Sequence, residues 1–390
     1  MTPPRAVSPA RALEAARAMA PATPGQEVAF TEAVGRRLAE AVTAARDLPA
    51  ADAAAMDGWA VRASGAVRRV RVAGESVAGR PFPGAVPDGG ACRIATGALL
   101  PPGTDAVLRL EDGSAGADGV LVVPPLAPGR DVRPRASEVA AGTVVFPAGH
   151  LLRAHDLGVL AAIDRPGVRC HRRVRVALVG SGDELVDPGD TGGRPEVVID
   201  SNVPMLAAQV AAAGGELVHA ARVPDGPGDL ERGIAAARAA NPDVLVTVGG
   251  ASVGDRDHVR RTLGLLGAVA LADGLLARPG HPVWLGALDG MPVLALPGNP
   301  GAAQVMFHLL GRALLGVPDP WTPTVVAREI RGRERDDLFV RCAATPEGLV
   351  PLEDQRPASV RALGTCDALA WVPAGGGVAA GGPVAASRLA

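Results

Sequence analysis

Apolar runs alternate with amphipathic segments from residue 174 to residue 315. Of all the features of the sequence, this alternation most strongly restricts which folds the chain can adopt. The runs are short and rich in Val, Leu and Ala, as buried strands are, and the segments between them repeat apolar residues at helical spacing. Strands are predicted at 174–179, 217–223 and 244–248, with a further strand pair around 271–276 and 293–296. Helices are predicted at 203–213, 230–239, 258–266 and 301–315. The pattern predicts a doubly wound α/β sheet with helices on both faces.

The sequence outside this region has a different pattern of apolar residues. Ser8 followed by proline is a typical helix start and predicts a first helix that ends before Pro21. Apolar spacing predicts a second helix at 31–43 and another at 154–163. From residue 49 to 142, and again after residue 320, short Val, Leu and Ile runs are broken by Gly and Pro, which is typical of small antiparallel β-structure.

These segments predict an α/β and β multidomain protein. Its parts are an α+β connector domain (25–46 with 143–174), a small β-rich domain (47–142), a doubly wound domain (5–24 with 175–318) and a C-terminal β-barrel-like domain (319–390).

Composition argues against several classes of function. The 39 Lys and Arg residues balance 41 Asp and Glu residues, so no net positive charge attracts nucleic acid or an anionic membrane. All of these cations are Arg, which leaves no lysine for catalysis or anion binding. The four cysteines form no CxxC pair and signal neither a zinc site nor a disulfide framework. Without a long apolar run or a signal pattern, we expect a cytoplasmic protein with no nucleic-acid or membrane partner.

Three glycine-containing loops follow predicted strands, at 180–184, 249–255 and 297–300. Ligands of an open α/β sheet bind outside the carboxyl ends of the strands, so these loops are expected to face one pocket. Glycine lets the backbone approach a phosphate, and a helix that follows adds partial positive charge and free N–H groups. A single loop of this kind is more often only a turn, and the functional interpretation depends on all three together.

Carboxylates accompany these loops: Asp183, Glu184, Asp225, Asp255 and Asp257. Carboxylates beside phosphate-binding backbone suit Mg²⁺, which takes few protein ligands and keeps several waters. Any one of them alone is better explained as an acidic loop residue on the surface.

Motifs along nearly the whole chain resemble those of the molybdopterin molybdenumtransferases, the family that includes the gephyrin E domain. The matching elements, in order, are Ala55-Met56-Asp57-Gly58-Trp59-Ala60, Arg93-Ile94-Ala95-Thr96-Gly97, Ser181-Gly182-Asp183-Glu184-Leu185, Asp200-Ser201-Asn202, Gly249-Gly250 with Ser252-Val253-Gly254-Asp255, and Leu296-Pro297-Gly298-Asn299-Pro300. The resemblance implies an elongated homodimer that inserts molybdate into adenylated molybdopterin with Mg²⁺ and releases AMP. It also implies a cleft shared between the doubly wound domain of one subunit and the small β-domain of the other, and leaves a molybdopterin adenylyltransferase as a possible partner.

The resemblance assigns roles to individual positions. The catalytic residues are expected to be Asp57, Glu184, Asp225 and Asp257, with Glu184 and Asp257 holding Mg²⁺. Substrate-binding residues are expected to be Thr96, Arg133, Arg135, Glu138, Ser181, Gly182, Gly249, Gly250, Ser252, Gly254, Pro297, Gly298, Asn299 and Pro300. Arg278 and His281 are expected to bind molybdate.

The chain departs from the family pattern at the anion pocket. It has Arg278-Pro279-Gly280-His281-Pro282 where relatives read Lys-Pro-Gly-Lys-Pro, and Gly301-Ala302 where they read Val-Ser. Ala53-Ala54 replaces Asn-Ser. An arginine can still bind an oxyanion through two N–H groups, whereas a histidine is charged only in part near neutral pH. Backbone N–H groups at the start of the helix that follows Pro300 are expected to remain available to the anion.

Two functions therefore stay open. One is an active molybdenum insertase. The other is a non-catalytic molybdopterin-binding paralogue that acts as a carrier or scaffold. Retention of the carboxylates favours the enzyme, because an unpaired buried carboxylate is costly without a metal or a partner. The choice between molybdate and tungstate, and the presence of a second paralogue, are open at this stage.

Overall fold

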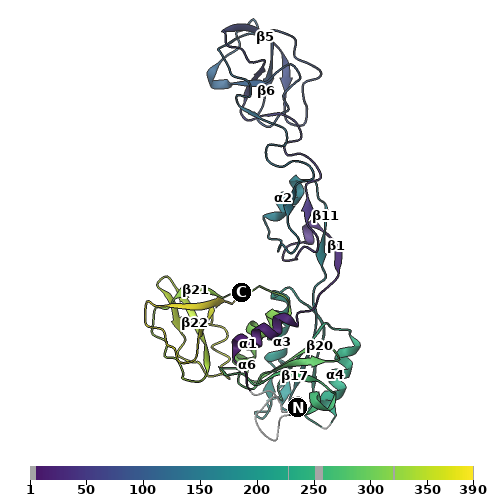
Figure 1. Cartoon of the computed structure of the whole chain (residues 1–390), viewed down its shortest axis with the longest axis vertical. Coiled ribbons are helices and arrows are strands. Elements are labelled where there is room, and N and C mark those ends of the chain that lie inside the picture. The colour runs from purple at the N-terminus through teal and green to yellow at the C-terminus, as the bar shows by residue number, and fades with distance from the viewer. Residues whose placement is uncertain (1–5, 227, 251–257, 319–320, 390) are drawn as a thin grey trace. The chain divides into compact units, whose positions relative to one another are not determined.

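The chain forms two compact units in the computed structural model, which describes residues 6–226, 228–250, 258–318 and 321–389. Unit 1 comprises Met1–Thr23 with Arg173–Ala390, and unit 2 comprises Pro24–Arg172. The first helix of the chain therefore belongs to the same unit as the doubly wound region (Figure 1). The boundaries of the four predicted domains remain a prediction.

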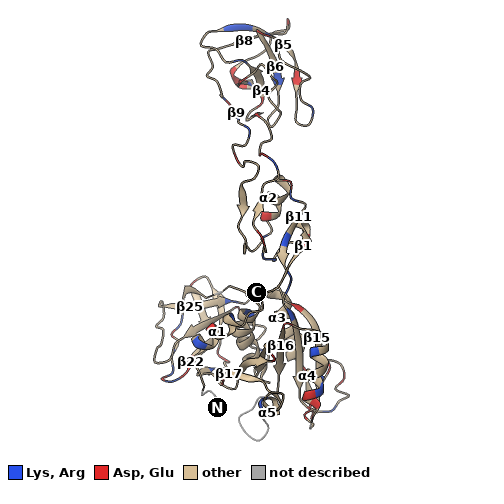
Figure 2. Ribbon diagram, turned by 45° about the vertical axis from the view of Figure 1, so that its right-hand side comes forward, with Lys and Arg blue, Asp and Glu red and all other residues tan. Residues whose placement is uncertain are grey.

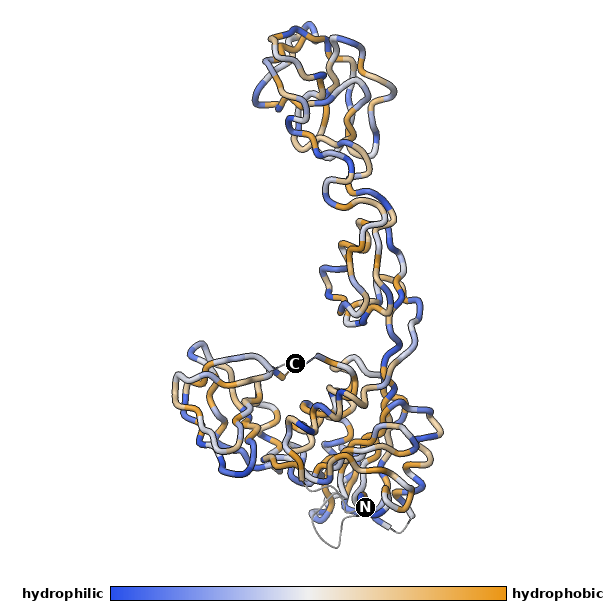
Figure 3. The backbone as a smooth tube through the Cα atoms, viewed as in Figure 1, coloured by the Kyte–Doolittle hydropathy of each residue, from blue (hydrophilic) through white to orange (hydrophobic). Residues whose placement is uncertain are grey.

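The centre of unit 1 is the predicted doubly wound sheet. Its strand order is β15 (Glu216–Val223), β12 (Arg175–Ser181), β16 (Val244–Val248), β20 (Met291–Leu296), β19 (Trp284–Leu288) and β17 (Val269–Asp273). The first four strands are parallel, and β19 and β17 extend the sheet with antiparallel pairs. Because the central strands are buried on both faces, they are largely apolar. Hydrophobic stretches, coloured orange, run through unit 1 in Figure 3.

Helices cover both faces of this sheet, as predicted. One face packs against α1 (Pro9–Ala18), α3 (Asn202–Ala212) and the consecutive segments α6 (Pro300–Met306), a π-helical turn (Phe307–Gly311) and α7 (Arg312–Leu314). The other face packs against α4 (Asp229–Ala239) and α5 (His258–Leu265). The Ser8 side chain accepts a hydrogen bond from the Arg11 N–H, which confirms the predicted start of α1.

A second sheet of unit 1 lies toward the C-terminus, as the sequence predicts. It contains β18 (Ala277–Arg278), β22 (Asp337–Thr345), β24 (Ala368–Val372), β25 (Pro383–Arg388) and β21 (Thr322–Val325), with β23 (Gly348–Pro351) paired to β22. Phe339 and Leu369 of this sheet join the hydrophobic core beneath α6, so the two sheets of unit 1 share a packed interface.

Unit 2 is built mainly from short strands. Its largest sheet has the order β7 (Ala106–Arg109), β4 (Gly58–Val61), β6 (Gly90–Ile94), β5 (Arg68–Ser76) and β8 (Val120–Val123). Strand pairs are formed by β3 (Ala53–Ala54) with β9 (Val132–Arg133), β1 (Gly25–Ala29) with β11 (Gly167–His171), and β2 (Val42–Thr43) with β10 (Val144–Phe146). It also contains α2 (Asp156–Ala162) and the 3₁₀ turns Phe30–Glu32 and Leu110–Asp112.

Two sequence predictions of secondary structure were wrong. The helix predicted at 31–43 is a 3₁₀ turn followed by bridges and the short strand β2, because Gly35 takes a positive φ of 73° that ends any helix. The strand pair predicted around 271–276 and 293–296 is separated by β19, which pairs with both β17 and β20.

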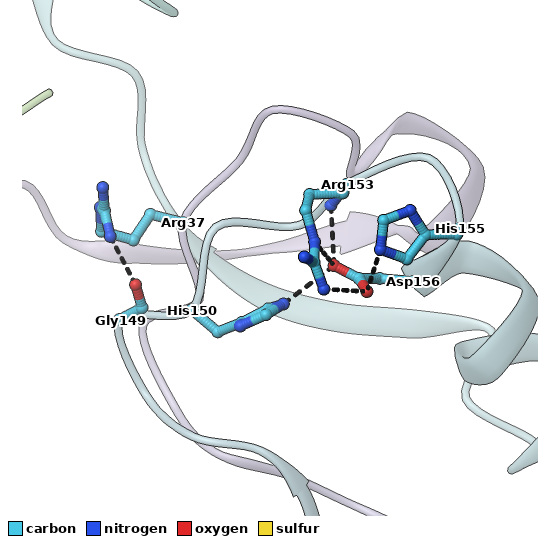
Figure 4. A network of polar contacts seen from close by, with 6 residues as sticks. All are labelled: Arg37, Gly149, His150, Arg153, His155 and Asp156. Atoms are coloured by element: carbon cyan, nitrogen blue, oxygen red, sulfur yellow. Dashed lines mark hydrogen bonds and ion pairs between the residues drawn. The ribbon is translucent and has the colours of Figure 1, made fainter. Parts of the chain in front are cut away.

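A buried carboxylate organises the α2 end of unit 2 (Figure 4). Asp156 is 2% exposed and accepts hydrogen bonds from the Arg153 backbone N–H (2.9 Å), the Arg153 guanidinium (3.2 Å) and His150 Nε2 (2.9 Å). The hydrogen bond from the Arg153 side chain is the main reason why the pKa of Asp156 lies well below its usual range. The cluster fixes the first turn of α2 to the segment that precedes it.

Charges of both signs are interspersed over both units (Figure 2). No helix in the described part of the chain is long and apolar enough to cross a membrane.

Candidate active site

The described residues of the three glycine loops, which include only Gly249 and Gly250 of the second loop, come together around one cavity of about 950 Å³ in unit 1. They follow β12, β16 and β20, whose carboxyl ends meet at the same edge of the sheet. The predicted site residues that line this cavity are Ser181, Glu184, Asp225, Gly249, Gly250, Pro297, Gly298, Asn299 and Pro300.

Glycine is required where the second loop crosses the first. Gly249 has a φ of 92°, and a Cβ built there would lie 2.3 Å from the Ser181 carbonyl oxygen. Gly250 has a φ of 60°, and its Cβ would lie 3.3 Å from Ser181 Oγ. Both positions therefore need the backbone freedom of glycine, and they bring two loops into backbone contact at the floor of the cavity.

Gly182 leaves space for the predicted catalytic carboxylate. A Cβ at Gly182 would lie 2.9 Å from Glu184 Oε2 and 3.0 Å from Oε1. The backbone of Glu184 is held by a hydrogen bond from Val198 N (2.8 Å), beside the short parallel pair β13 (Leu185–Val186) and β14 (Val198–Ile199). Glu184 is exposed and lines the cavity.

Asp225 is tied to the first loop by two contacts. Its Oδ1 accepts a hydrogen bond from Ser181 Oγ, and its backbone N–H donates to Asp183 Oδ1 over 2.9 Å. Asp183 therefore has a structural role between the loops. Because the Ser181 hydroxyl donates to only one carboxylate oxygen of Asp225, the second carboxylate oxygen remains available to a ligand in the cavity.

The predicted metal site is only partly described. Ser252, Gly254, Asp255 and Asp257 lie outside the described residues. Among the residues that the structure describes, no cluster of three or more His, Cys, Asp and Glu side chains has the arrangement of a metal site. Glu184 and Asp225 supply oxygen donors, which is the ligand type that Mg²⁺ prefers.

The start of α6 does not offer the free N–H groups that the sequence led us to expect. The Gly301 N–H donates to the Pro357 carbonyl (2.8 Å), and the Ala302 and Ala303 N–H groups both donate to the Asn299 carbonyl (3.0 and 2.9 Å). Pro300 has no N–H. The expectation was wrong because the segment around Pro357 covers this helix end.

Several residues that line the cavity had no role assigned from the sequence: Asp200, Ser201 and Asn202 at the start of α3, and Ala358 and Val360 after β23. Asp200 Oδ1 caps α3 by accepting from the backbone N–H of Asn202 over 2.9 Å. The Asn202 side chain donates to the Gly298 carbonyl over 2.7 Å and so fixes the third loop. The Asp-Ser-Asn motif was a visible signal for the first group, whereas nothing local in the sequence marks Ala358 or Val360.

The predicted molybdate ligands do not line this cavity. Arg278 lines a second cavity in unit 1, of about 620 Å³, and its Nε donates to Asp336 over 3.2 Å. His281 lines neither cavity. Its Nδ1 lies 2.9 Å from the Leu275 carbonyl oxygen, and because a carbonyl oxygen only accepts, Nδ1 is the donor in this hydrogen bond. Only the neighbouring Pro282 reaches the first cavity.

In unit 2, the structure brings Asp57 and Thr96 together. Asp57 Oδ1 accepts hydrogen bonds from Thr96 N (2.6 Å) and Thr96 Oγ1 (3.0 Å). These hydrogen bonds, above all the one from the Thr96 backbone N–H, lower the pKa of the Asp57 carboxyl. The group is therefore ionised at neutral pH. Its other oxygen has no part in these bonds and can act on a ligand.

Arg133 and Glu138 form an ion pair with each other, while Arg135 pairs with Asp47. Pairing of β3 with β9 places Arg133 opposite Ala53, a few residues before Asp57. Ala53 and Ala54 are both buried and form β3, the strand that precedes the Met56-Asp57-Gly58 segment.

The fold and the cavity define a protein of the class that combines a doubly wound α/β ligand-binding domain with β-rich domains. Two family models match the chain: the MoeA N-terminal region (domain I and II) over residues 7–163, and the probable molybdopterin binding domain over residues 177–316. A crystal structure of the molybdopterin biosynthesis MoeA protein from Pyrococcus horikoshii aligns with a TM-score of 0.83 and 26% identity, covering 98% of this chain and 99% of that one.

Curated relatives agree with this assignment. The molybdopterin molybdenumtransferase of Nostoc sp. is 37% identical over 78% of this chain and 72% of its own length, and that of Synechococcus elongatus is 30% identical over 93% and 94%. The chain belongs to the molybdopterin molybdenumtransferase family, transferases of molybdenum cofactor biosynthesis.

Proposed function

We propose that the protein inserts molybdate into adenylated molybdopterin and releases AMP. The observation that carries this proposal is the 950 Å³ cavity, in which three glycine loops meet beside the carboxylates of Glu184 and Asp225. Close backbone approach at Gly249 and Gly250 suits the phosphate groups of the substrate, and the volume suits a large ligand.

The carboxylates are proposed to bind Mg²⁺ as the resident cofactor. Glu184 and Asp257 are the expected ligands, and Asp225 lies in the same cavity as Glu184. When bound, Mg²⁺ would neutralise phosphate charge as AMP leaves. The chain's own residues orient this site: Ser181 holds one oxygen of Asp225, and Gly182 leaves space for the carboxylate of Glu184.

Arg278 and His281 are retained as proposed molybdate ligands, and Asp57, Thr96, Arg133, Arg135 and Glu138 as substrate-contacting residues of unit 2. We propose that the active form is a cytoplasmic homodimer in which Asp57 of one subunit acts on the cavity of the other. A molybdopterin adenylyltransferase is the natural source of the adenylated substrate.

The decisive experiment mixes purified protein, adenylated molybdopterin and Mg²⁺, and follows AMP before and after molybdate is added. The proposal expects AMP release that depends on molybdate. A carrier or scaffold would bind adenylated molybdopterin and release no AMP, and tungstate in place of molybdate defines which oxyanion is accepted.

A further inference from the structure

We propose that Asp200 recognises the ribose hydroxyl groups of a nucleotide in the 950 Å³ cavity. Asp200 lines this cavity just before α3 and has no role in the function proposed above. The inference rests on that function in one respect, because it takes the ribose to be that of the adenylate half of the substrate. It adds a residue that distinguishes a ribonucleotide from its deoxy analogues.

The Asp200 side chain is buried, yet only half of its carboxylate is used by the protein. The residue is 5% exposed. Its Oδ1 accepts hydrogen bonds from the backbone N–H groups of Asn202 (2.9 Å) and Val203 (3.1 Å), which caps α3. Among the residues that the structure describes, none donates to Oδ2 and none forms an ion pair with the carboxylate. One oxygen of a buried carboxylate therefore lacks a donor at the cavity wall.

A buried carboxylate of this kind is costly unless a donor or a cation satisfies it. The two N–H groups and the positive end of α3 offset part of the cost. The side-chain oxygen of Asn202 also has no partner, but it is sealed from solvent, whereas Oδ2 of Asp200 is not. A ligand in the cavity can therefore supply the missing donor to Asp200.

The arrangement selects the kind of donor. A carboxylate oxygen accepts about two hydrogen bonds, and Oδ1 of Asp200 already accepts two. A side-by-side pair of N–H groups, such as the edge of a pterin, needs both carboxylate oxygens and is not served. Two neighbouring hydroxyl groups can donate to one oxygen. Other nucleotide-binding α/β sheets also use a carboxylate to bind ribose hydroxyl groups.

The residues beside Asp200 suit the rest of a nucleoside. Val198 and Ile199, which form β14 directly before it, are exposed and line the same cavity. Val360 is also exposed and lines it. An apolar wall suits a flat heterocyclic base, whereas a hydrated Mg²⁺ ion prefers oxygen ligands on every side.

The position of Asp200 is fixed between the first and third glycine loops. Its backbone N–H donates to the Val186 carbonyl over 2.9 Å, just after the first loop. Two residues later, the Asn202 side chain donates to the Gly298 carbonyl of the third loop over 2.7 Å. These loops are the proposed binding place of the phosphate groups. The carboxylate therefore lies where the sugar of a nucleotide follows its phosphate.

The test is calorimetric titration of the full-length protein with AMP and with 2′,3′-dideoxy-AMP, which lacks both hydroxyl groups. The wild type is expected to bind AMP about tenfold more tightly, because hydrogen bonds from hydroxyl groups to a carboxylate are charge-assisted. Asp200→Ser keeps a side chain that caps helices but is too short to reach the ribose. The preference for AMP is expected to disappear in this variant while the affinity for dideoxy-AMP is unchanged. A purely structural role in α3 would weaken the binding of both ligands alike.

Asp190→Ser is the matched control, since Asp190 is an exposed carboxylate of the loop before β14 and does not line the cavity. This control is expected to keep the wild-type preference. Asp200→Asn tests the site should the serine variant not fold. Its oxygen is held by the N–H groups of α3, so that its NH₂ group replaces the charged acceptor, and the preference for AMP is expected to fall.

The outcomes separate the possible ligands. Equal affinity of the wild type for AMP and dideoxy-AMP, or an unchanged preference in Asp200→Ser, overturns the proposal. Weaker Mn²⁺ binding by Asp200→Ser without nucleotide assigns the carboxylate to a metal ion, and weaker binding of 6-hydroxymethylpterin alone assigns it to the pterin; each result overturns the proposal. A protein that prefers AMP to dideoxy-AMP through Asp200 but releases no AMP in the reaction assay rejects the proposed function and retains the ribose site.

Discussion

At the scale of single residues, the cavity depends on where glycine is needed for geometry and where it only leaves space. Gly249 has a positive φ and would place a Cβ 2.3 Å from backbone oxygen. Gly298 lines the same cavity, yet its Cβ would meet only the Gly249 Cα, at 3.4 Å. The two positions form a matched pair for one substitution.

Gly249→Ala is expected to lower the free energy of unfolding by roughly 1–3 kcal/mol, because the new Cβ clashes with Ser181 and strains the backbone. Gly298→Ala is expected to change it by less than about 0.5 kcal/mol, since its Cβ makes an ordinary contact. Denaturant unfolding of both variants checks this. Equal stability of the two would show that the loops do not cross as described.

At the scale of elements, the segment 354–357 and the start of α6 are held together by Arg341 and Gly301. A Cβ at Gly301 would lie 2.7 Å from Arg341 Nη1 and 2.9 Å from the Pro357 carbonyl oxygen. Gln355 strengthens the contact, since its Nε2 donates to the Arg341 carbonyl over 2.8 Å. Glycine at 301 therefore allows this close packing.

Gly301→Val is expected to destabilise the protein by roughly 1–3 kcal/mol, because overpacking displaces either Arg341 or the covering segment. Gly264→Val in α5 is the control, as no atom lies within 4 Å of a Cβ at Gly264. Thermal unfolding compares the two. A Gly301→Val protein as stable as the control would mean that the segment moves aside freely.

The Asp156 cluster of unit 2 gives a prediction about pH. Asp156→Asn is expected to reduce the local stability of α2 by roughly 1–3 kcal/mol, because a buried carboxylate with several donors is lost. The pKa of Asp156 is lowered from an ordinary value of 3.8, so its stabilisation is present above about pH 4 and is lost as pH falls below that. The loss is complete only when pH falls through the lowered pKa, so hydrogen exchange of the α2 amides at pH 6 and at about pH 2 measures this.

Glu40→Gln is the control for Asp156→Asn. Glu40 pairs with Arg169 over 3.0 Å at the surface, where an ion pair contributes about 0–1 kcal/mol. Similar exchange rates in the two variants would contradict a structural role for the Asp156 cluster.

At the scale of the whole molecule, the sequence predicts architecture better than it predicts contacts. The doubly wound sheet was visible because its strands and helices have strong and different periods. The helix at 31–43 failed because bridges to Leu151 and Cys170, far along the chain, override a local apolar spacing. For the same reason the wall formed by Ala358 and Val360 was not predictable, since it depends on how the C-terminal sheet packs on α6.

The proposed homodimer makes a prediction at this scale. Asp57→Ala and Glu184→Gln subunits are expected to be inactive alone and to regain activity when mixed, because a heterodimer would contain one intact cleft. AMP release after subunit exchange measures this, with the exchange itself followed by differently tagged subunits. Heterodimers that form without any return of activity would show that each cleft is built from one subunit.

The most direct test of the central claim is single-turnover AMP release by wild-type protein and by Glu184→Gln, each saturated with adenylated molybdopterin. Glutamine keeps the shape of the side chain and removes its charge. The proposed reaction predicts molybdate-dependent release of one AMP per site by the wild type, and a fall of about a hundredfold or more in Glu184→Gln with substrate binding retained. Bound substrate without AMP release in the wild type, or equal rates in the two proteins, would contradict it.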